Sequence, residues 1–117
     1  MSSALLSISI VTYQLDFVQF AHALKRLKLA IQSLSRQLPG TVTLTLIDNS
    51  NDEDRLAQIV SATGFGIHVA ILNPNKNLGY GKAHNLAIAT TSASFHLIMN
   101  PDVLISEDAL QIAVAYM

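Results

Sequence analysis

Four short apolar stretches alternate with four longer segments in which apolar residues recur every three or four positions. The short stretches are rich in β-branched and aliphatic residues, as buried strands are, and lie at Leu5–Thr12, Val42–Ile47, Ile67–Leu72 and Phe95–Met99. The periodic segments predict helices and lie at Asp16–Leu38, Asp52–Ala62, Lys82–Thr90 and Ser106–Tyr116. This alternation predicts an α/β fold, with a mainly parallel sheet and helices on both faces.

Three of the predicted helices begin after a residue whose side chain suits an N-cap. Asp16 precedes the first helix. Ser106 precedes the last one, where Glu107 would lie in the first turn and interact favourably with the helix dipole. Ser50 followed by Glu53 fits a capping box at the start of the second helix. These signals indicate where those three helices are expected to begin.

The chain of 117 residues is long enough for one domain or part of one. Half of its residues are hydrophobic, its mean hydropathy is +0.39 and 13% of its residues are charged, against about 25% in an ordinary soluble domain. Two interpretations fit: a compact, slightly apolar domain, or a fragment whose missing remainder would cover an apolar face. We favour the fragment, and we expect the exposed apolar face to join copies of the chain into a homo-oligomer.

Charge and cysteine content argue against several classes of function. The formal net charge is −1 and the pI is near 6.4, so the chain lacks the basic field that attracts nucleic acid. The chain has no cysteine, and hence neither a disulfide framework nor a thiolate metal site.

The N-terminal stretch lacks the positively charged region of a signal peptide. No apolar run reaches the ~18 residues that a transmembrane helix needs. We expect a cytoplasmic protein, associated at most peripherally with the inner face of the membrane.

Polar loops follow all four predicted strands. They are Thr12-Tyr13, Asp48–Asn51, Asn73–Gly81 and Asn100–Asp102. In parallel α/β sheets, ligands bind outside the carboxyl ends of the strands. The four loops are therefore expected to form one binding site.

Asp48 ends a predicted strand and precedes a helix. The run Asp-Asn-Ser-Asn that it opens would serve, in the simplest interpretation, to cap that helix. Capping needs only one such residue, however, and an acid at this position binds a sugar hydroxyl or a base edge in doubly wound folds. Asp48 is therefore a candidate ligand-binding residue.

The sequence Asn100-Pro101-Asp102 interrupts an apolar run. Proline cannot continue the hydrogen-bonded ladder and stiffens the turn, which would hold Asp102 at the rim of the sheet. One aspartate suffices to hold Mg²⁺ or Mn²⁺ when a substrate diphosphate and water supply the other ligands. A plain turn is the alternative interpretation.

Gly79 and Gly81, followed by Lys82, suggest a phosphate-binding loop, although their spacing matches neither standard glycine-rich motif. His84 falls in the first turn of the predicted third helix, where a lone histidine is more often a surface or packing residue than a general base. The remaining histidines are scattered and share no metal-ligand spacing; they are His22, His68 and His96.

Four segments together resemble the N-terminal, nucleotide-sugar-binding half of family 2 glycosyltransferases of the GT-A fold, and are most similar to the bacterial rhamnosyltransferase-like branch. The segments are SISIVTYQ, LTLIDNSNDED, NKNLGYGKAHNLAI and FHLIMNPDVLI. They follow the family's order and cover essentially the whole chain. The resemblance implies that residues 1–117 form a Rossmann-like donor-binding part, truncated before the acceptor-binding part and the acid that serves as catalytic base.

The resemblance also implies a role for each matching residue. Thr12 and Tyr13 would contact the base of the donor, and Asp48 would hold the base or the ribose. The loop near the nucleotide or the sugar is represented by Asn77, Gly79, Gly81 and Asn85. Asn100 replaces the first acid of the family's D-x-D motif. Asp102, the last acid of the motif, would bind the Mg²⁺ or Mn²⁺ that bridges the donor diphosphate.

The implied reaction transfers a sugar from a nucleoside diphosphate sugar, such as dTDP-rhamnose or a UDP-sugar, to a hydroxyl of a saccharide acceptor, with inversion. The implied setting is cell-surface polysaccharide synthesis, and the chain alone is expected to bind donor without transferring sugar. A non-catalytic nucleotide-binding module and a sugar nucleotidyltransferase are the alternatives. Nucleotidyltransferases carry a glycine-rich, basic loop after the first strand, where this chain has Tyr13–Asp16.

Overall fold

The computed structural model describes residues 4–38, 40–74, 78–89 and 92–116. Its strands all pair in parallel and are β1 (Leu6–Thr12), β2 (Val42–Asp48), β3 (His68–Leu72) and β4 (Phe95–Met99). The helices are α1 (Phe17–Gln37), α2 (Glu53–Thr63), α3 (Tyr80–Ala89) and α4 (Ala109–Ala115). The predicted α/β fold is confirmed.

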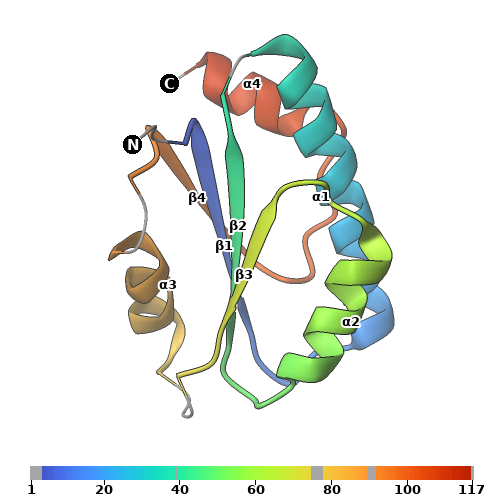
Figure 1. The fold of residues 1–117 in the computed structure, drawn as a ribbon, viewed down its shortest axis with the longest axis vertical. Coiled ribbons are helices and arrows are strands. Elements are labelled where there is room, and N and C mark those ends of the chain that lie inside the picture. Colours follow the sequence, from blue (N-terminus) through green and yellow to red (C-terminus); the bar gives the residue numbers. More distant parts are fainter. Residues whose placement is uncertain (1–3, 39, 75–77, 90–91, 117) are drawn as a thin grey trace.

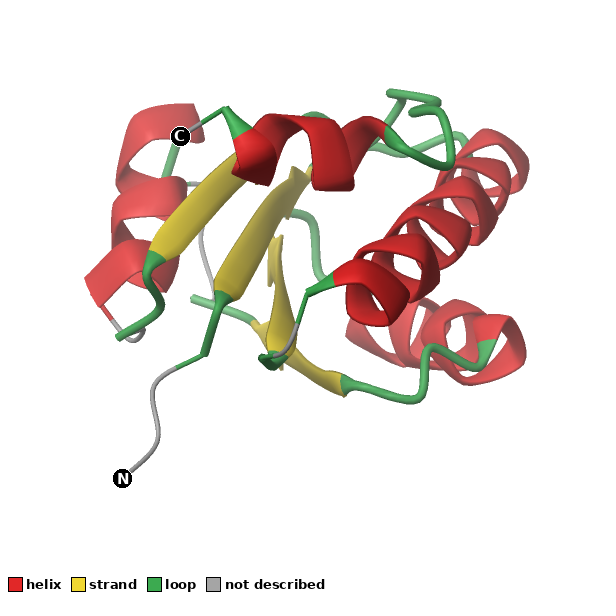
Figure 2. Ribbon diagram, turned by 90° about the horizontal axis from the view of Figure 1, so that it is seen from above, coloured by secondary structure: helices red, strands yellow, loops and turns green. Residues whose placement is uncertain are grey.

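The sheet has the strand order β3-β2-β1-β4 and separates two unequal helical layers. Figure 1 shows α1, α2 and α4 on one face of the sheet and α3 alone on the other. The view from above in Figure 2 shows the same arrangement, with the strands between the two layers. Helices therefore cover both faces, as the sequence predicted. The predicted end of the third helix, Thr90, lies outside the described residues.

β1 is the central strand, and all seven of its residues are buried. Its even-numbered apolar residues, Leu6, Ile8 and Ile10, belong to the main core under α1. The alternate residues belong to the face under α3, where Val11 joins a small apolar cluster. Ser7 and Ser9 are also buried in this strand. A strand covered on both faces is thus apolar toward one helical layer and partly polar toward the other.

α1 contributes the largest set of core side chains. Its buried apolar residues recur at helical spacing and include Phe20, Leu24, Leu27, Ile31 and Leu34. They pack against residues from the middle of the sheet, among them Ile8, Ile10, Leu44 and Leu46. The predicted N-cap is confirmed, because the Asp16 side chain accepts a hydrogen bond from the backbone N–H of Gln19 at 3.1 Å. No described helix combines the length and the apolar composition needed to cross a bilayer.

The predicted capping box of α2 is wrong. The helix begins at Glu53 with Asp52 at the N-cap position, and Ser50 donates a hydrogen bond to the Asp52 carboxylate at 2.9 Å. Asn51 has a φ of +59°, so the backbone turns sharply between Ser50 and the helix. The serine therefore lies too far back along the chain to be the residue that caps α2.

The predicted start of the last helix is also wrong. α4 begins only at Ala109, and Ser106 donates to the side chain of Asp108 at 2.9 Å. Glu107 consequently precedes the helix and forms an exposed ion pair with Arg36 of α1 at 3.4 Å. A pair as exposed as this contributes little to stability.

Replacement of Leu27 by alanine tests the importance of the main core. The Leu27 side chain is fully buried, whereas Leu29 of the same helix is 44% exposed. We expect Leu27→Ala to lower the free energy of unfolding by about 2–5 kcal/mol and Leu29→Ala to change it by less than about 1 kcal/mol. Urea denaturation measures both. Equal losses for the two variants would contradict the assigned packing of α1.

Candidate functional site

All four strands end at the same edge of the sheet because they run in parallel. Thr12 and Asp48, the last residues of β1 and β2, are register partners. Met99, the last residue of β4, pairs with Ile10, so the Asn100–Asp102 turn begins beside the end of β1. The loops that the sequence predicted to lie together do start from one edge.

Hydrogen bonds connect the loops that follow β1 and β2. The backbone N–H of Asn49 donates to the Thr12 carbonyl at 2.9 Å. The N–H of Gln14 donates to the Ser50 hydroxyl at 3.3 Å. Gln14 has a φ of +49°, a conformation that is costly for a residue other than glycine. The first loop is therefore bent toward the second and bonded to it.

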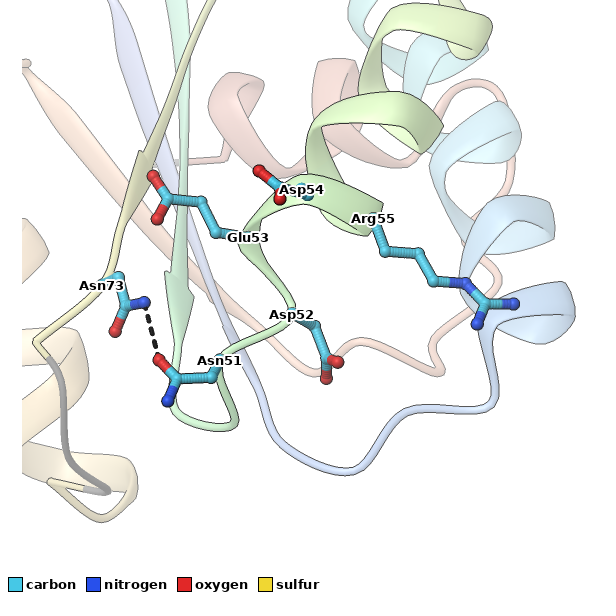
Figure 3. Close-up of a pocket in the computed structure, with 6 residues that line it drawn as sticks. All are labelled: Asn51, Asp52, Glu53, Asp54, Arg55 and Asn73. Atoms are coloured by element: carbon cyan, nitrogen blue, oxygen red, sulfur yellow. Dashed lines mark hydrogen bonds between the residues drawn. The ribbon is translucent and has the colours of Figure 1, made fainter.

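The loop after β3 is bonded to the same region. Asn73 donates through its side-chain amide to the side-chain oxygen of Asn51 at 2.9 Å (Figure 3). Past the segment 75–77, the N–H of Leu78 donates to the Asn49 side chain at 3.5 Å. The loops after β1, β2 and β3 thus form one connected structure around the end of β2.

Asp48 is at the centre of this structure and is only 1% exposed. Its Oδ1 accepts a hydrogen bond from the N–H of Ser50 at 3.0 Å, which is an Asx turn and not a helix cap. Its Oδ2 is buried and has no hydrogen-bond partner among the described residues. A buried carboxylate oxygen without a donor is unfavourable, so Asp48 is suited to accept a hydrogen bond from a ligand.

Thr12 and Tyr13 differ in how they could meet a ligand. Thr12 is buried, and its hydroxyl donates to the Ile47 carbonyl across a distance of 3.5 Å. Tyr13 is 47% exposed and begins the bent loop after β1. Of the two predicted base-contacting residues, Tyr13 is the one whose side chain faces outward.

The glycine loop leads directly into α3. Gly79 has a φ of +78° and immediately precedes the helix, where the carbonyl of Gly79 accepts from Ala83 N–H at 3.2 Å. Gly81 and Asn85 lie in the helix and are exposed. Asn77, the fourth predicted residue of this loop, lies outside the described residues. The backbone N–H groups at the start of α3 are therefore the part of this loop best suited to an anion.

Asn100 and Asp102 both lie on the exposed turn after β4. The Val103 N–H closes this turn onto the Asn100 carbonyl at 3.4 Å. In the described part of the chain, no group of three or more acidic or imidazole side chains could hold a metal ion. A cation at Asp102 would therefore need ligands from a bound substrate.

Sequence reasoning did not find an acidic depression of about 350 Å³ beside the loop after β2. Figure 3 shows the residues that line it: Asn51, Asp52, Glu53, Asp54, Arg55 and Asn73. The guanidinium of Arg55 is directed to the ring of Phe17, 4.1 Å from its centroid. The depression carries three carboxylates and one arginine, and the arginine side chain is directed to Phe17. Its net negative charge would therefore repel a diphosphate.

Sequence reasoning also missed two histidines that meet under α3. The Ser9 hydroxyl is 2.7 Å from Nδ1 of His84 and 2.9 Å from Nε2 of His96. Nδ1 of His96 is hydrogen-bonded to the Ser7 hydroxyl. Burial lowers the pKa of both histidines, and His96 lowers the pKa of His84 further by charge repulsion. The signal in the sequence was the pair of serines at alternate positions of an otherwise apolar strand.

Residues 7–117 match the sequence profile described as Glycosyl transferase family 2. The chain belongs to this family. A comparison with curated protein sequences gives no match.

Solved structures of S. aureus TarS share the fold of this glycosyltransferase chain. The structure of TarS 1-349 has a TM-score of 0.72 and 22% sequence identity, over 95% of this chain and 31% of that one. TarS 1-349 in complex with UDP-GlcNAc has a TM-score of 0.73 and 18% identity, over 95% of this chain and 30% of that one. The chain thus spans less than a third of the length of these structures. The expected Rossmann-like, GT-A-type fold is confirmed.

Gly79 and Gly81 provide a matched test of the loop before α3. A Cβ at either position would meet no atom within 4 Å, but only Gly79 has a positive φ. We expect Gly79→Ala to destabilise the domain by about 1–2 kcal/mol because of left-handed strain. We expect Gly81→Ala to be neutral or to stabilise by up to about 1 kcal/mol, since alanine favours a helix. Urea denaturation of the two variants measures the difference, and equal effects would contradict this loop geometry.

Proposed function

We propose that this domain binds the nucleoside diphosphate part of a sugar donor at the carboxyl edge of its sheet, as the donor-binding part of a glycosyltransferase. The observation that carries the proposal is the buried Oδ2 of Asp48, an acceptor without a protein donor among the described residues. The N3–H of uracil or thymine, or a ribose hydroxyl, is a donor of the required kind. Family membership and the likeness to a protein solved with UDP and UDP-GlcNAc support this choice of ligand.

The other residues of the edge would each hold a different part of the donor. Tyr13, which follows the register partner of Asp48, has an exposed side chain on which a base would stack. The N–H groups at the start of α3, after Gly79, would face phosphate oxygens or sugar hydroxyls. Asn85 in the same helix and Asn77 in the loop before it would add amide contacts to the nucleotide or the sugar.

Asp102 would hold Mg²⁺ or Mn²⁺ with the help of the donor diphosphate. Its carboxylate is exposed on the turn after β4, and hard cations of this size accept one protein carboxylate together with phosphate and water oxygens. Asn100 would contribute an amide oxygen or contact the donor directly. When bound, such an ion stabilises the charge that develops on the leaving diphosphate.

The complete reaction would join an acceptor hydroxyl oxygen to the anomeric carbon of the sugar, while the bond from that carbon to the diphosphate breaks. The acceptor proton needs a base, and we assign no residue of this chain to that role. The finer assignment, transfer of rhamnose from dTDP-rhamnose in cell-surface polysaccharide synthesis, is supported by the motif resemblance alone. Parallel titrations with UDP and dTDP would separate it from a UDP-sugar donor.

Asp48→Asn tests the base or ribose contact. Asparagine can retain the Asx turn through its oxygen, but it presents an amide donor in place of Oδ2. Loss of a hydrogen bond to a charged group is worth about 1.5–3 kcal/mol, so affinity for uridine and for UDP should both fall about 10–100-fold. Calorimetric titration measures both ligands. As the control, Asp54→Asn in the acidic depression should leave both affinities unchanged. If Asp54→Asn weakens binding of uridine and UDP while Asp48→Asn does not, the nucleotide binds in the depression and the proposal is wrong.

Asp102→Asn tests the metal contact. We expect it to abolish most of the gain in UDP affinity that Mn²⁺ produces, because the amide is a weaker ligand for a hard cation. Uridine, which has no phosphate, should bind the variant as it binds the original chain. The same calorimetric titrations, with and without Mn²⁺, measure this. Equal loss for uridine and UDP would show that Asp102 only maintains the turn.

A further inference from the structure

The face of the sheet under α3 is unusually polar near the amino ends of the strands. In register across the sheet, one row reads His68, Thr43, Ser7 and His96. The next row reads Ala70, Thr45, Ser9 and Ile98, with the two polar residues at its centre. The opposite face presents Ile8, Ile10, Leu44 and Leu46 at neighbouring positions. A buried polar face needs hydrogen bonds in order to be stable.

Few large apolar side chains hold α3 to this face. The buried apolar cluster between them consists of Val11, Ile47, Ala83 and Ala87, with Leu78 packed at its border. The two residues from α3 are alanines, each of which buries little surface. Among the described side chains of α3, His84 is the one other buried residue, so its hydrogen bonds contribute to how the helix is attached.

Ser9 joins α3 to β4 through β1. Its hydroxyl contacts Nδ1 of His84 and Nε2 of His96 at 2.7 and 2.9 Å, and His96 also contacts Ser7. A hydroxyl carries one proton, so with both rings neutral Ser9 donates to one imidazole and accepts from the other. If both rings are protonated, two N–H donors point at the same oxygen and two cations are separated by one atom.

No carboxylate is available on this face to balance a charged imidazole. Of the eight acidic residues in the chain, none belongs to α3, and the one within a strand is Asp48 at the far end of β2. β2 contributes the neutral Thr43 and Thr45 here. Among the side chains that the structure describes, the other titratable or charged groups of the elements around Ser9, His84 and His96 are exposed, and they are Lys82 of α3 and His68 of β3.

We propose that Ser9, His84 and His96 form a pH-sensitive latch that positions α3 on the sheet and releases the helix on acidification. The three are positioning residues, because they would act on the donor only through the loop and helix that carry Gly79, Gly81 and Asn85. That last consequence rests on the function proposed above. The latch itself is a property of the fold and can be tested without any ligand.

The direction of the pH effect follows from linkage. Burial lowers the pKa of both histidines in the folded chain below the ordinary value of 6.5. The unfolded or opened form therefore binds protons at a higher pH than the closed form. Closure of α3 is fully favourable above about pH 6.5 and weakens as pH falls toward the lowered pKa values. Each proton taken up on opening shifts the opening equilibrium by up to about tenfold per pH unit in this window.

Amide hydrogen exchange of the purified chain tests the latch directly. Between about pH 7.5 and about pH 5, we expect exchange in α3, corrected for intrinsic rates, to accelerate about tenfold or more while the centre of α1 stays protected. Imidazole NMR signals of the unmodified chain should show the pKa values of His84 and His96 below the ordinary imidazole value of 6.5. Titration of both rings at or above that value, or α3 exchange that does not respond to pH, would overturn the proposal.

Variants provide an independent test. The double variant His84→Gln, His96→Gln has no proton to gain in this range, so the acceleration of α3 exchange at low pH should disappear. His68→Gln changes an exposed histidine of the same face and should keep the original response. If the double variant does not fold, the NMR titration of the unmodified chain still decides. A folded double variant with the original pH response would refute the latch.

A UDP titration over the same pH range separates the latch from the proposed function. If the latch and the proposed function both hold, UDP affinity falls more steeply on acidification in the original chain than in the double variant, where only the protonation of the UDP phosphate remains. If UDP does not bind at any pH, the proposed function fails, while the exchange experiment still decides on the latch. If UDP binds with equal affinity at both pH values although α3 opens, the latch does not act on the donor site.

Discussion

The parallel pairing of β1 with both of its neighbours is the constraint on which the rest of the structure depends. β1 pairs with β2 along its full length, from Leu6 opposite Val42 to Thr12 opposite Asp48, and with β4 on its other side. A shift of one residue in either pairing would exchange the two faces of the sheet. The main core and the polar face would be lost together.

The same pairing gives Asp48 its environment. Because β2 lies between β1 and β3, the loops from both neighbours close over its end, and the bonds from Asn49 and Ser50 hold them there. The position of the carboxylate therefore depends on hydrogen bonds between loops. Several of these bonds use the side chains of Asn49, Ser50 and Asn51, so they depend on residue type as well as on chain geometry.

The sequence predicted the features that depend on long repeated patterns. Each strand was placed to within one residue, since buried β-branched runs bounded by polar loops are distinctive. The sequence also predicted that the loops after the strands start from one edge of the sheet, because the carboxyl ends of parallel strands lie on the same side. The start of α1 was correct because the Asp16 side chain does cap the helix, through the N–H of Gln19.

What the sequence did not predict depended on contacts between distant residues. Ser50 and Ser106 each bond to an aspartate two residues later and not to a helix N–H, a competition among local polar partners that composition does not resolve. His84 and His96 are twelve positions apart and are joined only through Ser9 of a third element. Neither the acidic depression nor this relay has a linear motif, so only the folded chain reveals them.

The polar character of the face under α3 has a consequence for solubility. When a helix detaches from an ordinary parallel sheet, it exposes apolar surface, and this surface promotes aggregation. Here the uncovered face would present the hydroxyls of Ser7, Ser9, Thr43 and Thr45 beside the apolar side chains of Val11 and Ile47. Detachment of α3 would therefore uncover less apolar surface than detachment of α1 from the other face of the sheet.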